Sequence, residues 1–519
     1  MDKIAIIDFG GQYCHLIARR IRDLGVYSEI LPFNTSFNKL ASIQPKGIIF
    51  SGGPSSVYEV NSPNLSKETF KMILKKNTPI LGICYGFHLI IHNLGGEIVA
   101  KDKKEYGKTS LKIIEPDVLL KHLDKMEIVW MSHGDQVITL PEGFEILAST
   151  ENCPIAAYGN NKANIYGVQF HPEVANTPKG NIILENFIFD VCKCKKEWEL
   201  RNWIQQAIEK IREEVGPEKR VILGLSGGVD SSVTAALLHN AIGDRLHCIF
   251  VNNGVLRKNE EIEVQKTFKD KLGFQNFHYV NAEQLFMDKL RGIEDPEEKR
   301  RIIGHTFIKV FENKTIELEH DFPDIHFLAQ GTIYPDRVET AATSNASVKI
   351  KSHHNLTLPD NMALEIIEPL RDLYKDEVRN IGLELGLPKK IIERHPFPGP
   401  GLAVRIIGAI DKEKLNILRE ADAILIEEIK KADVYENLWQ AFCVFLPLKT
   451  VGIMGDFRTY EYICAIRAVE SSDAMTANFA KLNWELLEKV GTRIINEVKG
   501  INRVVYDISN KPPSTIEYE

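Results

Sequence analysis

The stretch VILGLSGGVDSSVTAALLHNAI, residues 221–242, spans a complete transition from a strand to a helix. Residues 221–225 are apolar, as in a buried strand, residues 226–230 are rich in glycine, and residues 231–242 are typical of a helix. A second apolar run follows at residues 246–251. This strand–helix–strand order predicts a parallel sheet with a right-handed crossover.

The first part of the chain shows the same alternation. Apolar runs typical of buried strands alternate with helical patterns, with strands expected at 4–7, 47–50 and 79–83 and helices at 13–24 and 86–94. A charged stretch, residues 193–199, then leads into a helix that ends near Gly216 and Pro217. We therefore expect a first open, mostly parallel sheet and a linker to a second one.

The last part of the chain has a different pattern. The sequence PFPGPG, residues 396–401, is a rigid turn that neither a helix nor a central strand can cross. Beyond it we expect helices and strands in the order helix 412–431, strands 441–447 and 460–469, helix 474–498 and strand 502–508. The predicted fold class is α/β, with two doubly wound, mostly parallel-sheet domains followed by a small α+β domain, over residues 1–195, 196–400 and 401–519.

Length, charge and hydropathy restrict the kind of protein. The chain has 519 residues, enough for about three domains, and its formal net charge of −7 argues against a general nucleic-acid binder. No apolar run approaches the length needed to cross a bilayer. The opening residues, MDKIAIIDFGG, enter a strand-like run and do not have the pattern of a signal peptide. We expect a cytoplasmic enzyme that binds neither membrane nor nucleic acid.

The eight cysteines are scattered along a long chain, which favours reduced thiols over a disulfide framework. Cys192 and Cys194 form the one close pair, and no second ligand pair stands at zinc spacing from them. We therefore expect no zinc site there.

A candidate nucleophile stands between two glycines in PILGICYGF, residues 79–87. Gly82 and Gly86 flank Cys84, and this pattern is typical of a nucleophile elbow, a sharp turn from a strand to a helix that lifts the side chain clear. The helix N-terminus beneath the sulfur favours the reactive thiolate, and backbone N–H groups beside the turn can hold an oxyanion. The alternative is an ordinary buried thiol in a core strand.

A candidate base follows in GVQFHPE, residues 167–173. Pro172 forces a turn after His171, so that Glu173 can fold back and orient the imidazole, as the logic of a catalytic triad requires. Alone, His171 is compatible with an ordinary loop histidine. Together with the cysteine elbow it favours a Cys–His–Glu triad.

These residues resemble the class I glutamine amidotransferase family, as do SGGP at 51–54, which matches the family's oxyanion loop, and MSHGD at 131–135. The resemblance implies that Cys84 attacks the amide of glutamine, that His171 transfers the proton and that Glu173 orients His171. Ammonia leaves, and water then releases glutamate from the thioester. Where the family usually has glutamine, in a position that shapes the glutamine pocket, this chain has His88.

The glycine-rich loop of the opening stretch suits a phosphate group. Its glycines allow close approach of the backbone, its serines donate hydrogen bonds, and the helix dipole favours an anion. It lacks the lysine of a Walker A loop. The carboxylate of Asp230 would repel a triphosphate unless a cation lies between them, so Mg²⁺ is predicted there. The alternative is a plain glycine–serine turn.

The loop resembles that of the N-type ATP pyrophosphatase family, whose members cleave ATP between the α and β phosphates. They adenylate an oxygen of the acceptor and release pyrophosphate, which turns a poor leaving group into one that ammonia can displace. By this resemblance the ATP-binding residues are Ser226, Gly227, Gly228, Val229, Asp230, Ser231 and Ser232.

Across nearly its whole length the chain is similar to the glutamine-hydrolysing GMP synthase family. The stretches that carry this similarity are QGTIYPD at 330–336, IKSHHN at 350–355, HPFPGPG at 395–401 and KPPSTIE at 511–517. The resemblance implies that glutamine, ATP and XMP are the substrates and that the products are GMP, AMP and pyrophosphate. It also implies a homodimer formed through the C-terminal domain.

The resemblance assigns a set of XMP-binding residues: Arg301, Gln440, Lys511, Ile516 and Glu517. Cationic groups suit the phosphate, and an arginine offers a bidentate fork. Taken alone, the Lys–Arg–Arg run at 299–301 is typical of a solvated surface. The residue after 517 is tyrosine, where the family commonly has tryptophan.

Asp336, Glu339 and Lys351 are similar to lid residues that close over ATP and the adenylated intermediate. Lys351 would stabilise the developing charge on phosphate. The neighbouring pair His353–His354 is compatible with a metal site when taken alone, but the resemblance places it in or beside the lid. Residues 356–361 lack the paired glycines usual in the family.

Two other classes of function are open at this point. Another ATP-pyrophosphatase enzyme is one, but asparagine synthetases use an N-terminal cysteine where this chain has Asp2, and a tRNA thiolase should have a basic balance. A non-catalytic sensor derived from an enzyme is the other. Loss of Cys84, His171 or Asp230 would favour a sensor, and all three are present.

Overall fold

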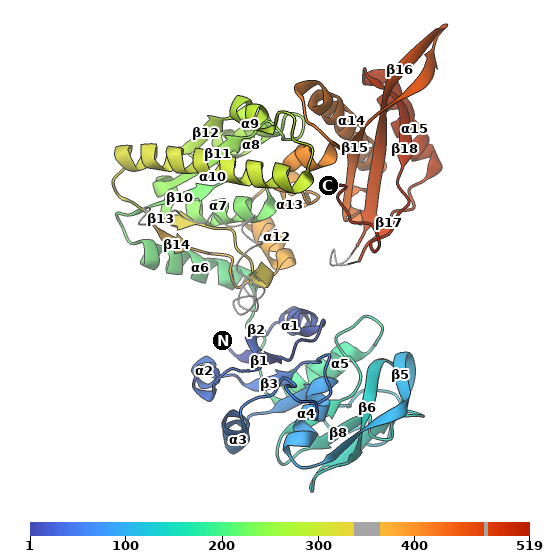
Figure 1. Ribbon diagram of the computed structural model, residues 1–519. Coiled ribbons are helices and arrows are strands. Elements are labelled where there is room, and N and C mark those ends of the chain that lie inside the picture. Colours follow the sequence, from blue (N-terminus) through green and yellow to red (C-terminus); the bar gives the residue numbers. More distant parts are fainter. Residues whose placement is uncertain (337–363, 472–475) are drawn as a thin grey trace. The chain divides into compact units, whose positions relative to one another are not determined.

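The computed structural model describes residues 1–336, 364–471 and 476–519. The chain forms two compact units, Met1–Trp203 and Ile204–Glu519 (Figure 1). The predicted boundary near residue 195 lies close to the division between these units, and the predicted boundary at residue 400 lies within the second unit.

The first unit is built on a nine-stranded sheet in the order β2-β1-β3-β4-β9-β8-β7-β5-β6. Its strands are β1 (Lys3–Asp8), β2 (Tyr27–Pro32), β3 (Gly47–Phe50), β4 (Ile80–Ile83), β5 (Glu97–Ile113), β6 (Met126–Thr139), β7 (Glu145–Ser149), β8 (Ala157–Asn160) and β9 (Ile165–Val168). Its helices are α1 (Cys14–Asp23), α2 (Phe37–Ile43), α3 (Lys67–Lys75), α4 (Tyr85–Asn93) and α5 (Gly180–Glu185), which continues as a π-helix over Asn186–Val191.

The sheet of the first unit has a parallel half and an antiparallel half. Strands β2, β1, β3, β4 and β9 pair in parallel, and they include all three strands predicted for this part of the chain. The predicted strands and helices of this half end within one residue of those observed. The antiparallel half, from β9 to β6, was not predicted. The mostly parallel sheet that was predicted therefore describes one half.

The stretch predicted to be a linker, residues 193–199, packs against the first unit. The backbone N–H of Trp198 donates to Gly25 at 2.9 Å, and its ring lies 5.0 Å from the ring of Tyr27. Only 8% of Trp198 is exposed. Helix α6 (Leu200–Val215) follows, as predicted.

The second unit contains a five-stranded sheet in the order β12-β11-β10-β13-β14, in which every neighbouring pair is parallel. The strands are β10 (Arg220–Gly224), β11 (Leu246–Asn252), β12 (Phe277–Asn281), β13 (Ile325–Ala329) and β14 (Glu365–Ile367). The helices are α7 (Val229–Ile242), α8 (Glu260–Gln265), α9 (Glu283–Leu290), α10 (Pro296–Asp321), α12 (Lys375–Glu384) and α13 (Lys389–Ile392). The strand–helix–strand order predicted for residues 221–251 is confirmed by β10, α7 and β11.

A four-stranded sheet and two helices complete the second unit. They are α14 (Lys412–Lys431), β15 (Gln440–Met454), β16 (Phe457–Glu470), β17 (Asn478–Phe479), α15 (Trp484–Glu497) and β18 (Ile501–Tyr506). Helix α14 has the predicted bounds, but the helix predicted from residue 474 begins only at Trp484. The preceding residues pair as β17 with β16, so sheet pairing overrides the helical pattern there.

One hydrophobic core runs through the second unit. Ile249 of β11 and Phe286 of α9 belong to the same buried cluster as Leu418 of α14 and Ile466 of β16. This shared core is the physical reason why the α/β part and the C-terminal α+β part form one compact unit.

Candidate functional site

Cys84 lies at the strained turn between β4 and α4. Its backbone has φ 54° and ψ −101°, a conformation that is rare for a residue with a side chain. A Cβ on Gly82 would lie 2.5 Å from the carbonyl oxygen of Gly86, and a Cβ on Gly86 would lie 2.3 Å from that of Phe50. Both glycines are therefore required by close backbone packing, as the elbow pattern predicted.

The structure brings Cys84, His171 and Glu173 together. Nδ1 of His171 lies 2.7 Å from Oε1 of Glu173, and the three residues are 8%, 4% and 1% exposed. Burial lowers the pKa of His171, but the Glu173 carboxylate and a hydrogen bond with Cys84 outweigh it and raise the pKa to about 10. The imidazole is therefore held in its protonated form beside the sulfur at neutral pH.

Backbone groups of β6 contact two members of the triad. The Sγ of Cys84 lies 3.6 Å from the carbonyl oxygen of Ser132, and the backbone N–H of His171 donates to the carbonyl oxygen of Trp130 at 3.0 Å. Thr177 donates to the carbonyl oxygen of His171 at 2.6 Å. Strand β6, which includes the MSHGD stretch, thus holds the cysteine and the histidine in register.

The SGGP loop lies against the triad as well. A Cβ on Gly52 would stand 3.3 Å from Cε1 of His171 and 3.7 Å from Cβ of Cys84. The hydroxyl of Ser51 accepts a hydrogen bond from the backbone N–H of Phe9 at 3.1 Å, and Gly86 donates to the carbonyl oxygen of Ser51 at 3.0 Å. The loop is therefore fixed to the elbow by its backbone, as an oxyanion loop requires.

His88 and Gln169 form a buried polar pair in this region. Among the described residues, Nε2 of His88 and both polar atoms of the Gln169 carboxamide have no partner of good hydrogen-bond geometry. Burial lowers the pKa of His88 to about 4, against the opposing effect of Asp135, so the imidazole is neutral. Buried polar groups without partners are costly, which favours a ligand for this pair.

The second constellation is the loop between β10 and α7. Gly228, in an extended conformation, is the N-cap of α7, so the helix begins at Val229, two residues before the predicted start. The hydroxyls of Ser226 and Ser231 lie 2.9 Å apart, and the backbone N–H of Gly228 donates to Ser226 at 3.3 Å. Asp230 therefore lies in the first turn of the helix and not in the loop.

Asp230 is held by a cation of the chain itself. Nζ of Lys375, the first residue of α12, donates to Oδ2 of Asp230 at 2.6 Å. The other carboxylate oxygen, Oδ1, is buried and has no hydrogen-bond partner in the part of the chain that is described. A Cβ on Gly331, in the QGTIYPD stretch, would lie 3.3 Å from the backbone of Asp230. An orphaned carboxylate oxygen in this position fits a Mg²⁺ ion, which prefers oxygen ligands.

Of the residues predicted to bind XMP, Gln440 and Glu517 are in contact. Nε2 of Gln440 donates to Oε1 of Glu517 at 2.6 Å, and the same carboxylate accepts a bidentate pair from Arg405 at 2.9 and 3.0 Å. Ile516 packs in a small apolar cluster with Phe442. Arg405, which is fully buried, was not predicted from the sequence.

Three further predicted residues, Arg301, Lys511 and Asp336, have partners of their own. Arg301 is paired with Glu298 on the exposed side of α10, and Lys511 forms a β-bridge with Ala477. Asp336 accepts a hydrogen bond from the backbone N–H of Ile333 at 3.2 Å. The predicted lid residues Glu339 and Lys351, and the pair His353–His354, lie outside the described residues.

The Lys–Arg–Arg run, which taken alone is typical of a solvated surface, is buried at its first residue. The side chain of Lys299 is fully buried and is ion-paired with Glu519, while Arg300 donates to the backbone carbonyl of Glu519 at 2.5 Å. The pairing joins residues far apart in sequence, so no local pattern could have revealed it.

Two expectations from composition can be compared with the structure. All eight cysteines are free, in agreement with the expectation that there is no disulfide framework. Within the described ranges, no helix is both long and apolar enough to cross a membrane.

Comparison with known proteins matches three family models along the chain. Residues 5–191 match the model of class-I glutamine amidotransferases, residues 199–295 that of NAD synthase, and residues 427–518 that of the GMP synthase C-terminal domain. A glutamine-hydrolysing GMP synthase of Carboxydothermus hydrogenoformans is 55% identical over 519 residues, which cover 100% of both chains.

The chain belongs to the glutamine-hydrolysing GMP synthase family. A relative from Brachyspira hyodysenteriae with this description is 54% identical over 100% of this chain and 99% of its own. One from Aquifex aeolicus is 54% identical over 99% of both chains. The resemblance inferred from the motifs is thereby confirmed for the full length. Because the chain belongs to this family, the alternatives of an asparagine synthetase and a tRNA thiolase are excluded.

Proposed function

We propose that Cys84, His171 and Glu173 release ammonia from glutamine, and that the loop from Ser226 to Ser232 holds the ATP with which XMP is adenylated. As a GMP synthase, the chain transfers the amide nitrogen of glutamine to XMP and forms GMP, with ATP converted to AMP and pyrophosphate. The observation that carries the assignment of residues is the presence of both constellations in one chain, each at a strand-to-helix turn.

The glutaminase step follows from the geometry of the triad. His171, protonated beside the sulfur, keeps Cys84 as a thiolate and gives a proton to the leaving ammonia. Glu173 holds Nδ1 of the imidazole, so that Nε2 faces the reaction. Backbone N–H groups at the elbow and the SGGP loop stabilise the oxyanion. Water then attacks the thioester, with His171 as the base, and releases glutamate.

The second step needs charge neutralisation at the ATP loop. Asp230 would hold Mg²⁺ through the oxygen that has no protein partner. Bound Mg²⁺ supplies a positive charge that screens the phosphates from the carboxylate. The chain itself supplies backbone N–H groups at the start of α7 and the hydroxyls of Ser226, Ser231 and Ser232. Lys375, which donates to the other oxygen of Asp230, would add a positive charge of the chain itself beside the phosphates.

The XMP pocket is proposed around Gln440, Ile516 and Glu517, with Arg301 and Lys511 as the phosphate-binding cations. The support is the network of Arg405, Glu517 and Gln440, which fixes the C-terminal segment against β15. Asp336, Glu339 and Lys351 are proposed as lid residues on the basis of family resemblance.

A homodimer through the C-terminal part is also proposed. Strands β15 and β16 form a hairpin that extends beyond the remaining strands of its sheet (Figure 1). Its outer part exposes apolar side chains, with Ile453 75%, Phe457 79% and Tyr460 65% exposed. An exposed apolar group of this size favours a partner surface. Sedimentation at micromolar concentration should give a dimer, and a monomer would contradict the proposal.

We propose a division into three domains, 1–195, 196–400 and 401–519, and a cytoplasmic location. The three family matches fall one in each of the first, second and third ranges, and the free cysteines suit a reducing compartment.

The proposal is tested by release of pyrophosphate from ATP with different acceptors. XMP should stimulate release strongly over background, and other nucleotides should not.

Since the glutaminase and synthetase sites lie in different units, and free ammonia would escape, we also propose that bound XMP and ATP activate the triad. Equal glutaminase rates with and without XMP and ATP would contradict this coupling.

A further inference from the structure

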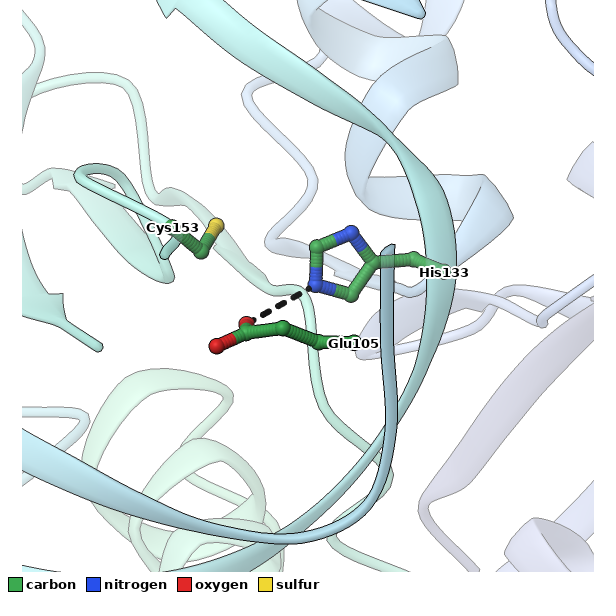
Figure 2. A group of neighbouring side chains, drawn as sticks. All are labelled: Glu105, His133 and Cys153. Carbon is green, nitrogen blue, oxygen red and sulfur yellow. Dashed lines mark hydrogen bonds and ion pairs between the residues drawn. The ribbon is translucent and has the colours of Figure 1, made fainter. Parts of the chain in front are cut away.

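Strands β5 and β6 carry a second buried carboxylate–imidazole pair near the triad. Glu105 and His133 stand opposite each other in the antiparallel register, and Nε2 of His133 lies 3.3 Å from Oε2 of Glu105. Their side chains are 4% and 2% exposed. Figure 2 shows the pair joined across the two strands, with Cys153 beside it. The glutaminase step described above does not use this pair.

Both ring nitrogens of His133 have partners inside the protein. Nδ1 lies 2.9 Å from the carbonyl oxygen of Asp135, which can only accept, so this nitrogen carries a proton. The other ring nitrogen, Nε2, faces the carboxyl group of Glu105. The ring is therefore held from two sides in one orientation.

The pair is anchored on its carboxylate side. The hydroxyl of Thr150 lies 2.9 Å from each oxygen of Glu105, and Nδ2 of Asn152 donates to Oε1 at 3.3 Å. Burying a carboxyl group and an imidazole is costly and adds little stability over apolar packing. Because the pair is nevertheless present and held in a hydrogen-bonded network, it favours a role in fixing one arrangement of the neighbouring strands.

The arrangement that it fixes is the position of β6 against the triad. Two residues that precede His133 on β6 contact catalytic groups: the carbonyl oxygen of Ser132 lies 3.6 Å from Sγ of Cys84, and that of Trp130 accepts from the backbone N–H of His171 at 3.0 Å. We propose that Glu105 and His133 are positioning residues of the glutaminase site, which hold β6 so that Cys84 and His171 stay in reactive geometry. This inference rests on the proposed role of the triad.

A metal ion is the alternative for the same side chains. One ligand atom each from Glu105, His133 and Cys153 lies within 4.8 Å of the others. Among the described residues, no other three histidine, cysteine or acidic side chains meet this condition. However, the Cys153 thiol already donates to Ile155 at 3.2 Å, and burial together with Glu105 raises its pKa to about 12. The Cys153 thiol has a protein acceptor, and Glu105 and His133 have partners of their own, so the group is complete without a metal.

The test compares three variants in the full-length enzyme. Glu105→Ala and His133→Ala break the pair, whereas in Glu105→Gln the carboxamide can donate to a neutral His133 and still accept from Thr150. We expect the first two to lower kcat for glutamine at least tenfold, with less than threefold change in KM, and Glu105→Gln to retain at least a third of the wild-type kcat. Formation of GMP from added ammonium should stay within twofold in all three.

Thiol reactivity separates positioning from loss of fold. An electrophilic chloroketone analogue of glutamine should alkylate Cys84 completely in Glu105→Ala, but about tenfold more slowly than in the wild type. Incomplete alkylation, which indicates unfolding of part of the sample, would overturn the inference, as would an unchanged kcat.

Two further controls complete the experiment. Cys153→Ser leaves the pair intact and should keep the wild-type kcat. Zinc content is measured in both proteins. One equivalent of zinc in the wild type that is lost in this variant would overturn the inference in favour of a metal site. Cys84→Ala is measured in parallel. Glutamine turnover in that variant would refute the proposed triad itself, an outcome that is distinct from any result with Glu105 or His133.

Discussion

The glutaminase site and the ATP loop differ in how far they are assembled without ligands. Cys84, His171 and Glu173 are buried and joined, with His171 and Glu173 2.7 Å apart. At the ATP loop, by contrast, Ser226 is exposed, and Asp230 is paired with Lys375, a cation of the chain itself. The difference follows from the chemistry. A covalent nucleophile needs its base in place beforehand, whereas a phosphate site receives its main charges with Mg²⁺ and ATP.

The largest effect is expected from Cys84→Ala. Loss of a nucleophile typically costs about 10⁴- to 10⁶-fold, so GMP formation from glutamine should vanish. Formation of GMP from ammonium should stay within twofold, because it uses only the second site. Both rates are measured by GMP formation. Cys194→Ser is the matched control, since Cys194 is 7% exposed against 8% for Cys84, and it should leave both rates unchanged.

Asp230→Asn should affect both nitrogen sources equally. Without the carboxylate, Mg²⁺ loses a charged ligand and the phosphates lose their screening, so GMP formation should fall by about 10²- to 10³-fold with glutamine or ammonium. Hydrolysis of glutamine without XMP should be unchanged. Removal of Mg²⁺ with a chelator should give the same pattern in the wild type. A variant that loses only the glutamine-dependent rate would contradict the division of labour.

Glu173→Gln should change both the rate and its pH dependence. Since His171 has a pKa raised to about 10, its protonated form persists through neutral pH and is lost only as pH rises through that value. Glutamine turnover should therefore hold up to about pH 9 in the wild type. In the variant, kcat should fall by about 10²-fold, and the alkaline decline should move toward the ordinary histidine value of 6.5. A decline at the same pH in both proteins would refute the role of Glu173.

The smallest effect is expected at His88. Replacement by alanine removes one neutral polar group from the proposed glutamine pocket, worth about 1 kcal/mol, so KM for glutamine should rise by about fivefold. His88→Gln keeps a donor and an acceptor and should stay within twofold. Steady-state hydrolysis of glutamine measures both. If neither variant moves KM, the orphaned Nε2 of His88 has no contact with glutamine.

Local patterns predicted more than long-range pairings. The elbow at Cys84 and the closeness of His171 to Glu173 follow from residues within a few positions of each other. Hydropathy predicted strands β1, β3, β4, β10 and β11 and helices α1, α4 and α7. The ion pairs of Lys299 with Glu519 and of Lys375 with Asp230 join distant residues, so the sequence pattern did not reveal them.

The antiparallel strands show the same limit. Strands β5 and β6 are long and mixed in polarity, and they pair in a register with bulges, so neither gives a clean alternation. The late start of α15 has a similar cause, because pairing of Phe479 with Val469 outweighs the helical tendency of the preceding segment. In both places the tertiary partner decides the structure.

Isotope labels test directly whether the nitrogen of glutamine displaces an adenylated oxygen of XMP. The enzyme is given ATP, glutamine labelled with ¹⁵N in its amide and XMP labelled with ¹⁸O at the 2-position, and the masses of GMP and AMP are measured. Displacement of the adenylated oxygen by ammonia should place ¹⁵N in GMP and ¹⁸O in the phosphate of AMP. Appearance of ¹⁸O in inorganic phosphate or pyrophosphate, or GMP without ¹⁵N, would contradict it.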